Sequence, residues 1–217
     1  KEIFISQWIN STAYEIDLST YGNLKNIIVS SQNYNLRSVD GVLYNSEKSE
    51  LLFYPASKEE SEYVSIKELK TIKSNAFKNA KYLTSIVLDN ERSSYGVEII
   101  EEAAFYGCAK LSEAHLGKTI REIGKEAFHG CTSIKYLEFI NTKSLKIDTY
   151  AFYECTGLES VSFYGISTDV GDYAFALCEN VSTLAVFGVN KIGSHAFSCN
   201  KIKQIFIPNP LTYIMSK

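Results

Sequence analysis

Hydrophobic residues recur along this chain at a regular interval, and the clearest marker is the dipeptide Ala-Phe. It occurs six times, with 22 to 28 residues between successive phenylalanines. An aliphatic residue stands five positions before each phenylalanine. The phenylalanines are Phe77, Phe105, Phe128, Phe152, Phe175 and Phe197, and the aliphatic residues are Ile72, Ile100, Ile123, Ile147, Val170 and Ile192. Such self-similarity is typical of a solenoid, in which stacked units bury a shared core.

A second pattern follows each Ala-Phe pair: three aliphatic positions of the form LxxLxL. Its last two positions alternate with polar or variable residues, which predicts a strand with one buried face. The triplets are Leu83-Ile86-Leu88, Leu111-Ala114-Leu116, Ile134-Leu137-Phe139, Leu158-Val161-Phe163, Val181-Leu184-Val186 and Ile202-Ile205-Ile207. Neighbouring strands should lie roughly 4.8 Å apart in a parallel ladder. Helix signals between the triplets are weak, so we expect short strands, turns or 3₁₀ pieces on the convex side.

The combined pattern, approximately IxxxAFxxCxxLxxIxL, runs through residues 69–207 and resembles the BspA-type leucine-rich repeat family. Residues 39–45 (VDGVLYN) and 51–55 (LLFYP) resemble the irregular, hairpin-bearing repeat that often interrupts arrays of this family. With the strand-like triplet at Leu24, Ile27 and Val29, the resemblance covers about residues 24–214. It implies a leucine-rich-repeat solenoid on a secreted or surface-anchored protein, commonly bacterial and sometimes protozoan. The roles proposed for such proteins are adhesion to host components or to other microbes.

The predicted fold class is mainly β, a solenoid with a parallel concave sheet and coils of about 23 residues. Residues 1–23, which include Trp8 and an Ile16-Leu18 alternation, fall outside a clear match and are interpreted as a divergent repeat or cap. Residues 24–68 form the irregular, hairpin-bearing repeat, and residues 69–217 form the leucine-rich-repeat array. We expect one continuous solenoid.

Composition and charge narrow the possible partners. The chain has 217 residues, 45% of them hydrophobic, and a formal net charge of −3 with mixed signs. This gives no basic stripe for nucleic acid or for anionic membranes, and no apolar run of about 18 residues that could span a bilayer. The chain begins at Lys1 and shows no signal peptide, which indicates a mature or trimmed form. We expect an extracellular or cell-surface location.

The five cysteines occupy one repeat position, shortly after each later Ala-Phe pair: Cys108, Cys131, Cys155, Cys178 and Cys199. Disulfides, metal ligation and burial as small hydrophobic residues are the alternatives. One cysteine per coil lacks the CxxC pairing of a zinc site, and Ala80 fills the same position in the first unit. We therefore expect a column of buried thiols, with no metal and no cofactor.

Catalytic motifs are absent from the sequence, which contains no GxSxG, HExxH, P-loop or GxGxxG pattern. The three histidines fall at three different repeat positions. We expect His115 on the exposed face of a strand, and His129 and His195 as solvated turn residues. The Glu101-Glu102 pair lies in a connecting segment and is interpreted as a solvated face. An enzyme is not expected.

Candidate binding residues come from the exposed face of the predicted sheet. In each LxxLxL strand, the residue between the last two aliphatics points away from the core, as do the residues two before and two after it. Ile140, Tyr164 and Phe187 occupy the last of these columns in consecutive units and would form an apolar stripe. The candidate ligand-binding set is Tyr136, Glu138, Ile140, Tyr164, Phe187 and Phe206. Alternatively, this column turns inward as the strand ends, or a connecting loop covers it.

Two further features bear on function. Residues 90–98 make their coil about five residues longer than the others, which predicts a contact loop or a tolerated decoration. Residues 207–214 restart a unit without an Ala-Phe pair, and an uncapped solenoid end can self-associate through its sheet edge. The predicted function is a non-enzymatic binding or adhesion module for another protein on a host or microbial surface. A structural or assembly spacer and a glycan-binding module are the alternatives.

Overall fold

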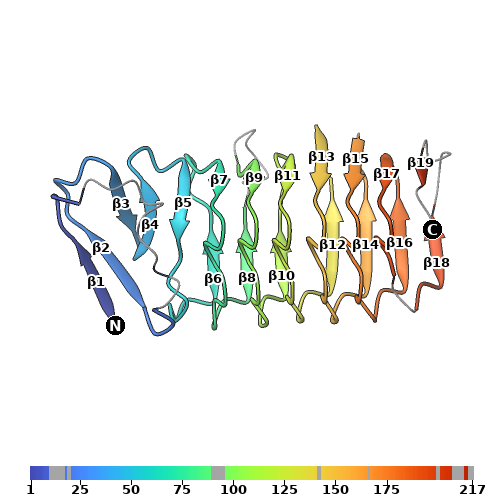
Figure 1. Cartoon of the computed structure of the whole chain (residues 1–217), viewed down its shortest axis with the longest axis horizontal. Coiled ribbons are helices and arrows are strands. Elements are labelled where there is room, and N and C mark those ends of the chain that lie inside the picture. The colour runs from blue at the N-terminus through green and yellow to red at the C-terminus, as the bar shows by residue number, and fades with distance from the viewer. Residues whose placement is uncertain are drawn as a thin grey trace.

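Short coils stacked in one row make up the protein, as a computed structural model shows (Figure 1). The structure describes residues 1–9, 18, 21–88, 96–140, 143–165, 167–198 and 201–206, and the backbone of 213–214. This part of the chain contains nineteen strands and no helix. Most of the long connection at 90–98, Cys199 and most of residues 207–214 lie outside the described residues.

The aliphatic triplets end in short parallel strands, which we call the triplet strands. They are β8 (Ser85–Val87), β10 (Glu113–His115), β12 (Tyr136–Phe139), β14 (Ser160–Phe163), β16 (Thr183–Val186) and β18 (Gln204–Phe206), and β6 (Glu62–Val64) extends the row by one strand. Leu137, Val161 and Leu184 lie in register on β12, β14 and β16, and all three are buried. The predicted parallel ladder of one-face-buried strands is confirmed.

The aliphatic column before the Ala-Phe pairs forms a second sheet, which we call the isoleucine sheet. Its parallel strands are β7 (Thr71–Ile72), β9 (Ile99–Ile100), β11 (Glu122–Ile123), β13 (Ser144–Ile147), β15 (Ser167–Val170), β17 (Val189–Ile192) and β19 (Tyr213–Ile214). β5 (Glu50–Phe53) continues the sheet, and the antiparallel hairpin of β3 (Leu36–Val39) and β4 (Val42–Asn45) ends it. The irregular segment therefore contains the expected hairpin.

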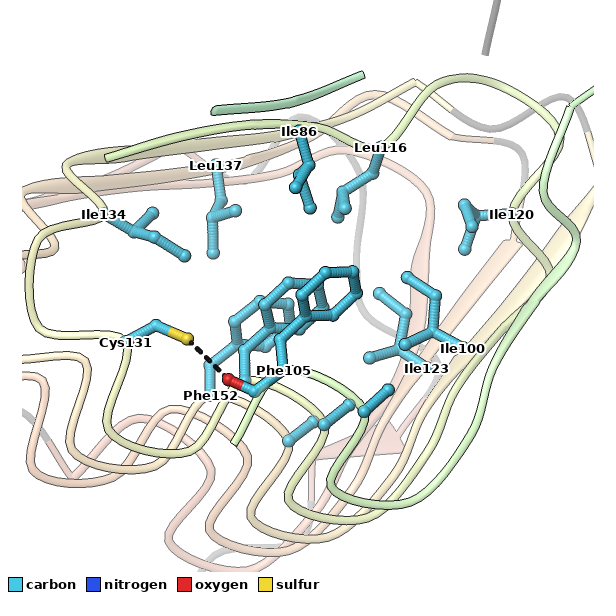
Figure 2. Close-up of a cluster of buried hydrophobic side chains, with 14 of the residues drawn as sticks. Ile86, Ile100, Phe105, Leu116, Ile120, Ile123, Cys131, Ile134, Leu137 and Phe152 are labelled. Carbon is cyan, nitrogen blue, oxygen red and sulfur yellow. Dashed lines mark hydrogen bonds between the residues drawn. The ribbon is translucent and has the colours of Figure 1, made fainter. Parts of the chain in front are cut away.

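A column of stacked phenylalanine rings runs through the middle of the coils (Figure 2). The ring centroids of Phe105 and Phe128 are 4.8 Å apart, and those of Phe128 and Phe152 are 5.0 Å apart with nearly parallel planes. Figure 2 shows Ile100 and Ile123 of the isoleucine sheet on one side of the rings and triplet-strand residues on another. Each unit thus completes its core by stacking on its neighbours.

The Ala-Phe segment forms the remaining side of each coil through a run of turns. Left-handed backbone, with φ between 54° and 70°, occurs two positions before and two positions after the phenylalanines, at Asn75, Asn79, Ala103, Gly107, Glu126, Gly130, Tyr150, Glu154, Tyr173, Leu177 and His195. Between them, the Phe77 N–H donates to the Ala104 carbonyl of the next coil at 2.7 Å, and this contact repeats along the row. The turns therefore continue the hydrogen-bonded ladder without a regular strand.

The four described cysteines are buried thiols in the core. Each donates to the phenylalanine carbonyl of the preceding coil; Cys131 Sγ lies 3.2 Å from Phe105 O (Figure 2), and Cys108 Sγ lies 3.0 Å from Phe77 O. Burial raises the pKa of the Cys108 thiol to about 12 and that of Cys131 well above its ordinary value. Because the thiolate is the reactive form, this shift disfavours reaction at these two thiols.

A smaller unit with its own core precedes the array. Its strands, β1 (Glu2–Ile5) and β2 (Asn26–Val29), pair in parallel. The buried residues of this unit form a cluster separate from the main core: Ile5, Leu18, Leu24, Ile27, Leu36 and Leu43. Leu36 and Leu43 belong to the hairpin, which therefore ties the first unit to the array.

Candidate binding surface

The predicted apolar stripe lies on the outside of the molecule, directly after three neighbouring triplet strands. Ile140 is 40% exposed and Tyr164 is 52% exposed, whereas Phe187 is half-buried. The backbone keeps these residues in register, because Tyr164 N donates to Phe139 O at 2.7 Å and Phe187 N donates to Phe163 O at 3.0 Å. The rings of Tyr164 and Phe187 stack with centroids 5.3 Å apart. The column therefore does not turn into the core.

The other predicted site residues fall into two places. Tyr136 and Glu138 point outward from β12, beside Ile140, and the Tyr136 hydroxyl donates to Glu159 Oε2 at 3.2 Å. Phe206, which is 49% exposed, lies in register with the Glu138 column but on β18. β18 is the third strand from β12, so Phe206 and Glu138 are about 14 Å apart. β18 also pairs directly with β16, which Phe187 follows. The six residues therefore lie along one run of neighbouring strands, with Phe206 at its far end.

A groove interrupts the triplet strands beside this surface. Within the described residues, β10 and β12 are not hydrogen-bonded, whereas every other adjacent pair from β6 to β18 is. The gap opens into a groove of about 540 Å³, with Glu113 and His115 on one wall and Tyr136, Glu138 and Ile140 on the other. The groove therefore joins directly onto the apolar stripe.

Backbone groups of β12 face this groove. The carbonyls of Lys135 and Phe139 accept hydrogen bonds from the β14 side of the strand, from Glu159 N and Tyr164 N. Because successive residues of a strand direct their N–H and C=O groups to opposite sides, the backbone groups of Tyr136 and Glu138 point toward β10. β12 therefore presents the edge of a sheet inside the groove.

Two carboxylates, those of Glu113 and Glu138, and one ammonium group, that of Lys118, line the groove. Glu113 and His115 are both exposed, and His115 Nε2 lies 3.8 Å from Glu113 Oε2. Glu138 is also exposed and has no ion-pair partner among the described residues. The surface thus combines apolar side chains with acidic groups that remain in contact with water.

One residue in the sequence indicates this groove, although the repeat pattern alone does not single it out. Ala114 occupies a triplet position that is Ile, Leu or Val in the five other units. It is only half-buried, whereas Ile86 and Leu137 on the neighbouring coils are buried. A short side chain contributes less apolar area to hold two strands together, so the break falls where the column is weakest.

His129 departs from the prediction. Its ring lies between Tyr106 and Tyr153, with centroids 4.6 Å and 5.1 Å away, and its Nε2 is 3.5 Å from Glu154 Oε2. The side chain is only 20% exposed, so the expectation of a solvated turn residue is wrong here. The cause is stacking between coils, since residues at equivalent positions cover one another along the solenoid. The other two histidines are exposed, as expected.

Other chemistry-bearing side chains are scattered over the described part of the chain. No group of three or more His, Cys, Asp or Glu residues within it could hold a metal ion. Ser194 Oγ lies 2.8 Å from His195 Nδ1, but this imidazole stacks on Tyr173 and contacts no described carboxylate. Within the same residues, no helix is long and apolar enough to cross a membrane.

Sequence comparison gives one clear match. The family model described as the BspA type leucine rich repeat region matches in six copies, over residues 49–144, 70–186 and 140–217. No curated protein matches the chain.

Solved structures of bacterial proteins share the fold. A leucine-rich repeat protein from Eubacterium ventriosum is 27% identical with a TM-score of 0.83, and the alignment covers 99% of this chain and 56% of that one. The pneumococcal vaccine antigen PcpA is 22% identical with a TM-score of 0.65, covering 97% and 56%. A leucine rich cell surface protein of Faecalibacterium prausnitzii is 22% identical with a TM-score of 0.56, covering 86% and 42%. The chain therefore spans about half the length of these proteins.

Proposed function

Because the chain belongs to the BspA-type leucine-rich repeat family, we propose that it is a non-enzymatic module that binds another protein outside a bacterial cell. The contact surface is the apolar stripe together with the groove between β10 and β12. One observation carries this proposal: three apolar side chains from consecutive coils, Ile140, Tyr164 and Phe187, adjoin an unpaired strand edge. Contiguous exposed apolar groups mark interaction sites more often than scattered ones.

The chemistry of the surface defines the partner. An apolar side chain of the partner covers Tyr164 and Ile140, and Lys or Arg groups pair with the carboxylates of Glu113 and Glu138. An extended segment of the partner can also hydrogen-bond to the open edge of β12, as in recognition by strand addition. The partner is therefore a protein with a basic and apolar segment.

Two structural relatives support an extracellular location. One is described as a vaccine antigen and another as a cell surface protein. Buried thiols are compatible with such a location, since the four described cysteines are shielded from oxidants by the core. The adhesive role common in the family fits the same surface.

A binding screen tests the proposal. Wild-type protein is passed over immobilised host extracellular matrix proteins and surface proteins of co-resident bacteria, and binding is measured by surface plasmon resonance. The double variant Ile140→Ser/Tyr164→Ser should lose about a hundredfold or more in affinity, because truncating central contacts costs roughly 2 kcal/mol each at an interface hot spot. Circular dichroism verifies that the variant stays folded.

Tyr82→Ser is the matched control. Tyr82 is also exposed, at 43%, but lies away from the triplet strands and under the Lys110 ammonium. A ligand that binds the double variant as tightly as the wild type would rule out the stripe as the contact surface. If no ligand binds but the protein dimerises through β18, where Ile205 and Phe206 are exposed, the assembly role would replace recognition.

A further inference from the structure

Among the described residues, the two most exposed large apolar side chains lie together at the N-terminal end of the molecule, away from the stripe. Tyr34 is 84% exposed, and Trp8, the only tryptophan of the chain, is 80% exposed. Trp8 follows β1, and Tyr34 lies in the connection between β2 and β3. A groove of about 610 Å³ has both rings in its walls. Its size is in the range of small-ligand sites.

A buried asparagine holds the two loops in place. Asn33 is 1% exposed, and its Nδ2 donates to Ser6 O at 2.9 Å and to Ile9 O at 3.2 Å. Its Oδ1 accepts from Asn35 N and Leu36 N, both at 2.9 Å. All hydrogen-bonding atoms of one side chain are thus used to join the Trp8 loop to the Tyr34 loop. The groove is preorganised, which lowers the entropic cost of binding.

The remaining lining residues are polar and uncharged, apart from one arginine. They are Gln7, Ser31, Gln32 and Arg37. Arg37 Nη1 donates to the carbonyls of Asn33 and Leu36, so part of its guanidinium is already engaged by the protein. No carboxylate of the described residues lines the groove. Amide and hydroxyl groups between two open aromatic rings suit a neutral ligand with both an apolar face and a polar rim.

Open ring faces distinguish this groove from the other exposed aromatic residues. Tyr164 stacks on Phe187, and Tyr173 stacks on His195 with planes only 5° apart. Each such stack covers one face of the two rings that take part in it. Neither Trp8 nor Tyr34 stacks on an aromatic ring of the described residues. A sugar ring binds an aromatic face through its axial C–H groups. The groove offers two unstacked rings for this contact, whereas in the stripe Tyr164 and Phe187 stack on each other.

We propose that the Trp8–Tyr34 groove binds a neutral pyranose residue of a glycan. The sugar stacks on one or both rings, and its hydroxyl groups exchange hydrogen bonds with Gln7, Gln32 and Ser31. This site is independent of the protein-binding surface, because it rests on different residues in a different unit of the fold.

The single tryptophan makes the proposal directly measurable. Titration with N-acetyllactosamine, chitotetraose and cellotetraose should change the intrinsic fluorescence of Trp8 in a saturable way for at least one probe. A printed array of neutral and sialylated oligosaccharides gives the wider specificity. Trp8→Ala should abolish the array signal, and Tyr34→Ala should weaken binding about tenfold, the effect of losing one aromatic contact. Both side chains are exposed, so neither change should unfold the protein.

Tyr164→Ser separates this proposal from the protein-binding one, since it should leave sugar binding unchanged. Absence of any bound saccharide at millimolar concentration would overturn the proposal. Sugar binding that survives both Trp8→Ala and Tyr34→Ala would do the same, as would binding of sialylated glycans alone. Loss of a protein ligand with Trp8→Ala, in the absence of sugar binding, would reassign the groove to protein recognition.

Discussion

Truncation of one ring in the middle of the phenylalanine column would show how far each coil depends on its neighbours. Phe128 is 0% exposed and stacks on Phe105 and Phe152. A Phe→Ala change in a core costs about 3–5 kcal/mol, and each lost ring pair accounts for roughly 0.5–1.5 kcal/mol. We therefore expect Phe128→Ala at the upper end, near 5 kcal/mol. Phe197 is only partly buried, and a Phe197→Ala change should cost about half as much.

Urea unfolding followed by far-ultraviolet circular dichroism measures these costs. In a linear array each coil contacts only its neighbours, so a weakened central coil should also uncouple the two halves of the solenoid. This uncoupling would lower the slope of the transition or split it in two. The total stability of such a domain is about 5–15 kcal/mol, so the loss expected for Phe128→Ala is large enough to unfold it. Phe128→Leu provides a second variant, which fills most of the space and remains folded.

Equal losses of stability in the two alanine variants would contradict this expectation. If Phe128→Ala and Phe197→Ala lower the free energy of unfolding by the same amount, position in the column does not matter. If Phe128→Leu is as stable as the wild type, the stacked rings contribute only volume. The first outcome would mean that stacking on two neighbours adds no stability, and the second that buried apolar volume, rather than ring stacking, holds the coils together.

Three further predictions use other parts of the structure. A thiol reagent should leave the four described cysteines unmodified in the native protein and label them during urea unfolding, as mass spectrometry of peptides would detect; labelling of Cys131 under native conditions would contradict its burial. Burial raises the pKa of Tyr44 from 10.0 to about 12. The protonated hydroxyl therefore stabilises the fold fully below pH 10, and this stabilisation is lost as pH rises toward 12. Tyr44→Phe should shift the midpoint of alkaline unfolding to higher pH, and an unchanged midpoint would exclude this cause. Asn33→Ala should increase hydrogen exchange in the loops around residues 6–9 and 33–36 and cost about 2 kcal/mol, whereas unchanged exchange would show that the loops hold each other by other contacts.

The repeated columns could be predicted from the sequence because stacking imposes the same demand on every coil. A buried position such as Ile123, Phe128 or Leu137 touches the equivalent residue of the next coil, so the pattern repeats wherever the core continues. For the ten-stranded isoleucine sheet, the sequence predicts no more than short strands, turns or 3₁₀ pieces. Its extent depends on hydrogen bonds between coils, which no single unit reveals.

Features set by contacts between coils could not be predicted from one repeat. His129 is covered because Tyr106 and Tyr153 occupy the same position in the coils on either side. Tyr150 and Tyr173 adopt left-handed backbone, which is uncommon for bulky residues. The ladder of hydrogen bonds to the next coil holds them there, so local propensity gives the wrong expectation at these turns.

Recognition in such a molecule is expected where the repeat is broken, for a physical reason. A residue that must stack on its equivalents cannot vary without loss of core, so the regular columns carry stability and little specificity. Ala114 relaxes one column and opens a strand edge beside Glu138, and the loop of Trp8 lies outside the array. Side chains at these places are not constrained by packing between coils, so their polar and aromatic groups can contact a partner. The two proposed sites follow this rule: one lies at the interruption of the triplet strands and the other in the unit that precedes the repeats.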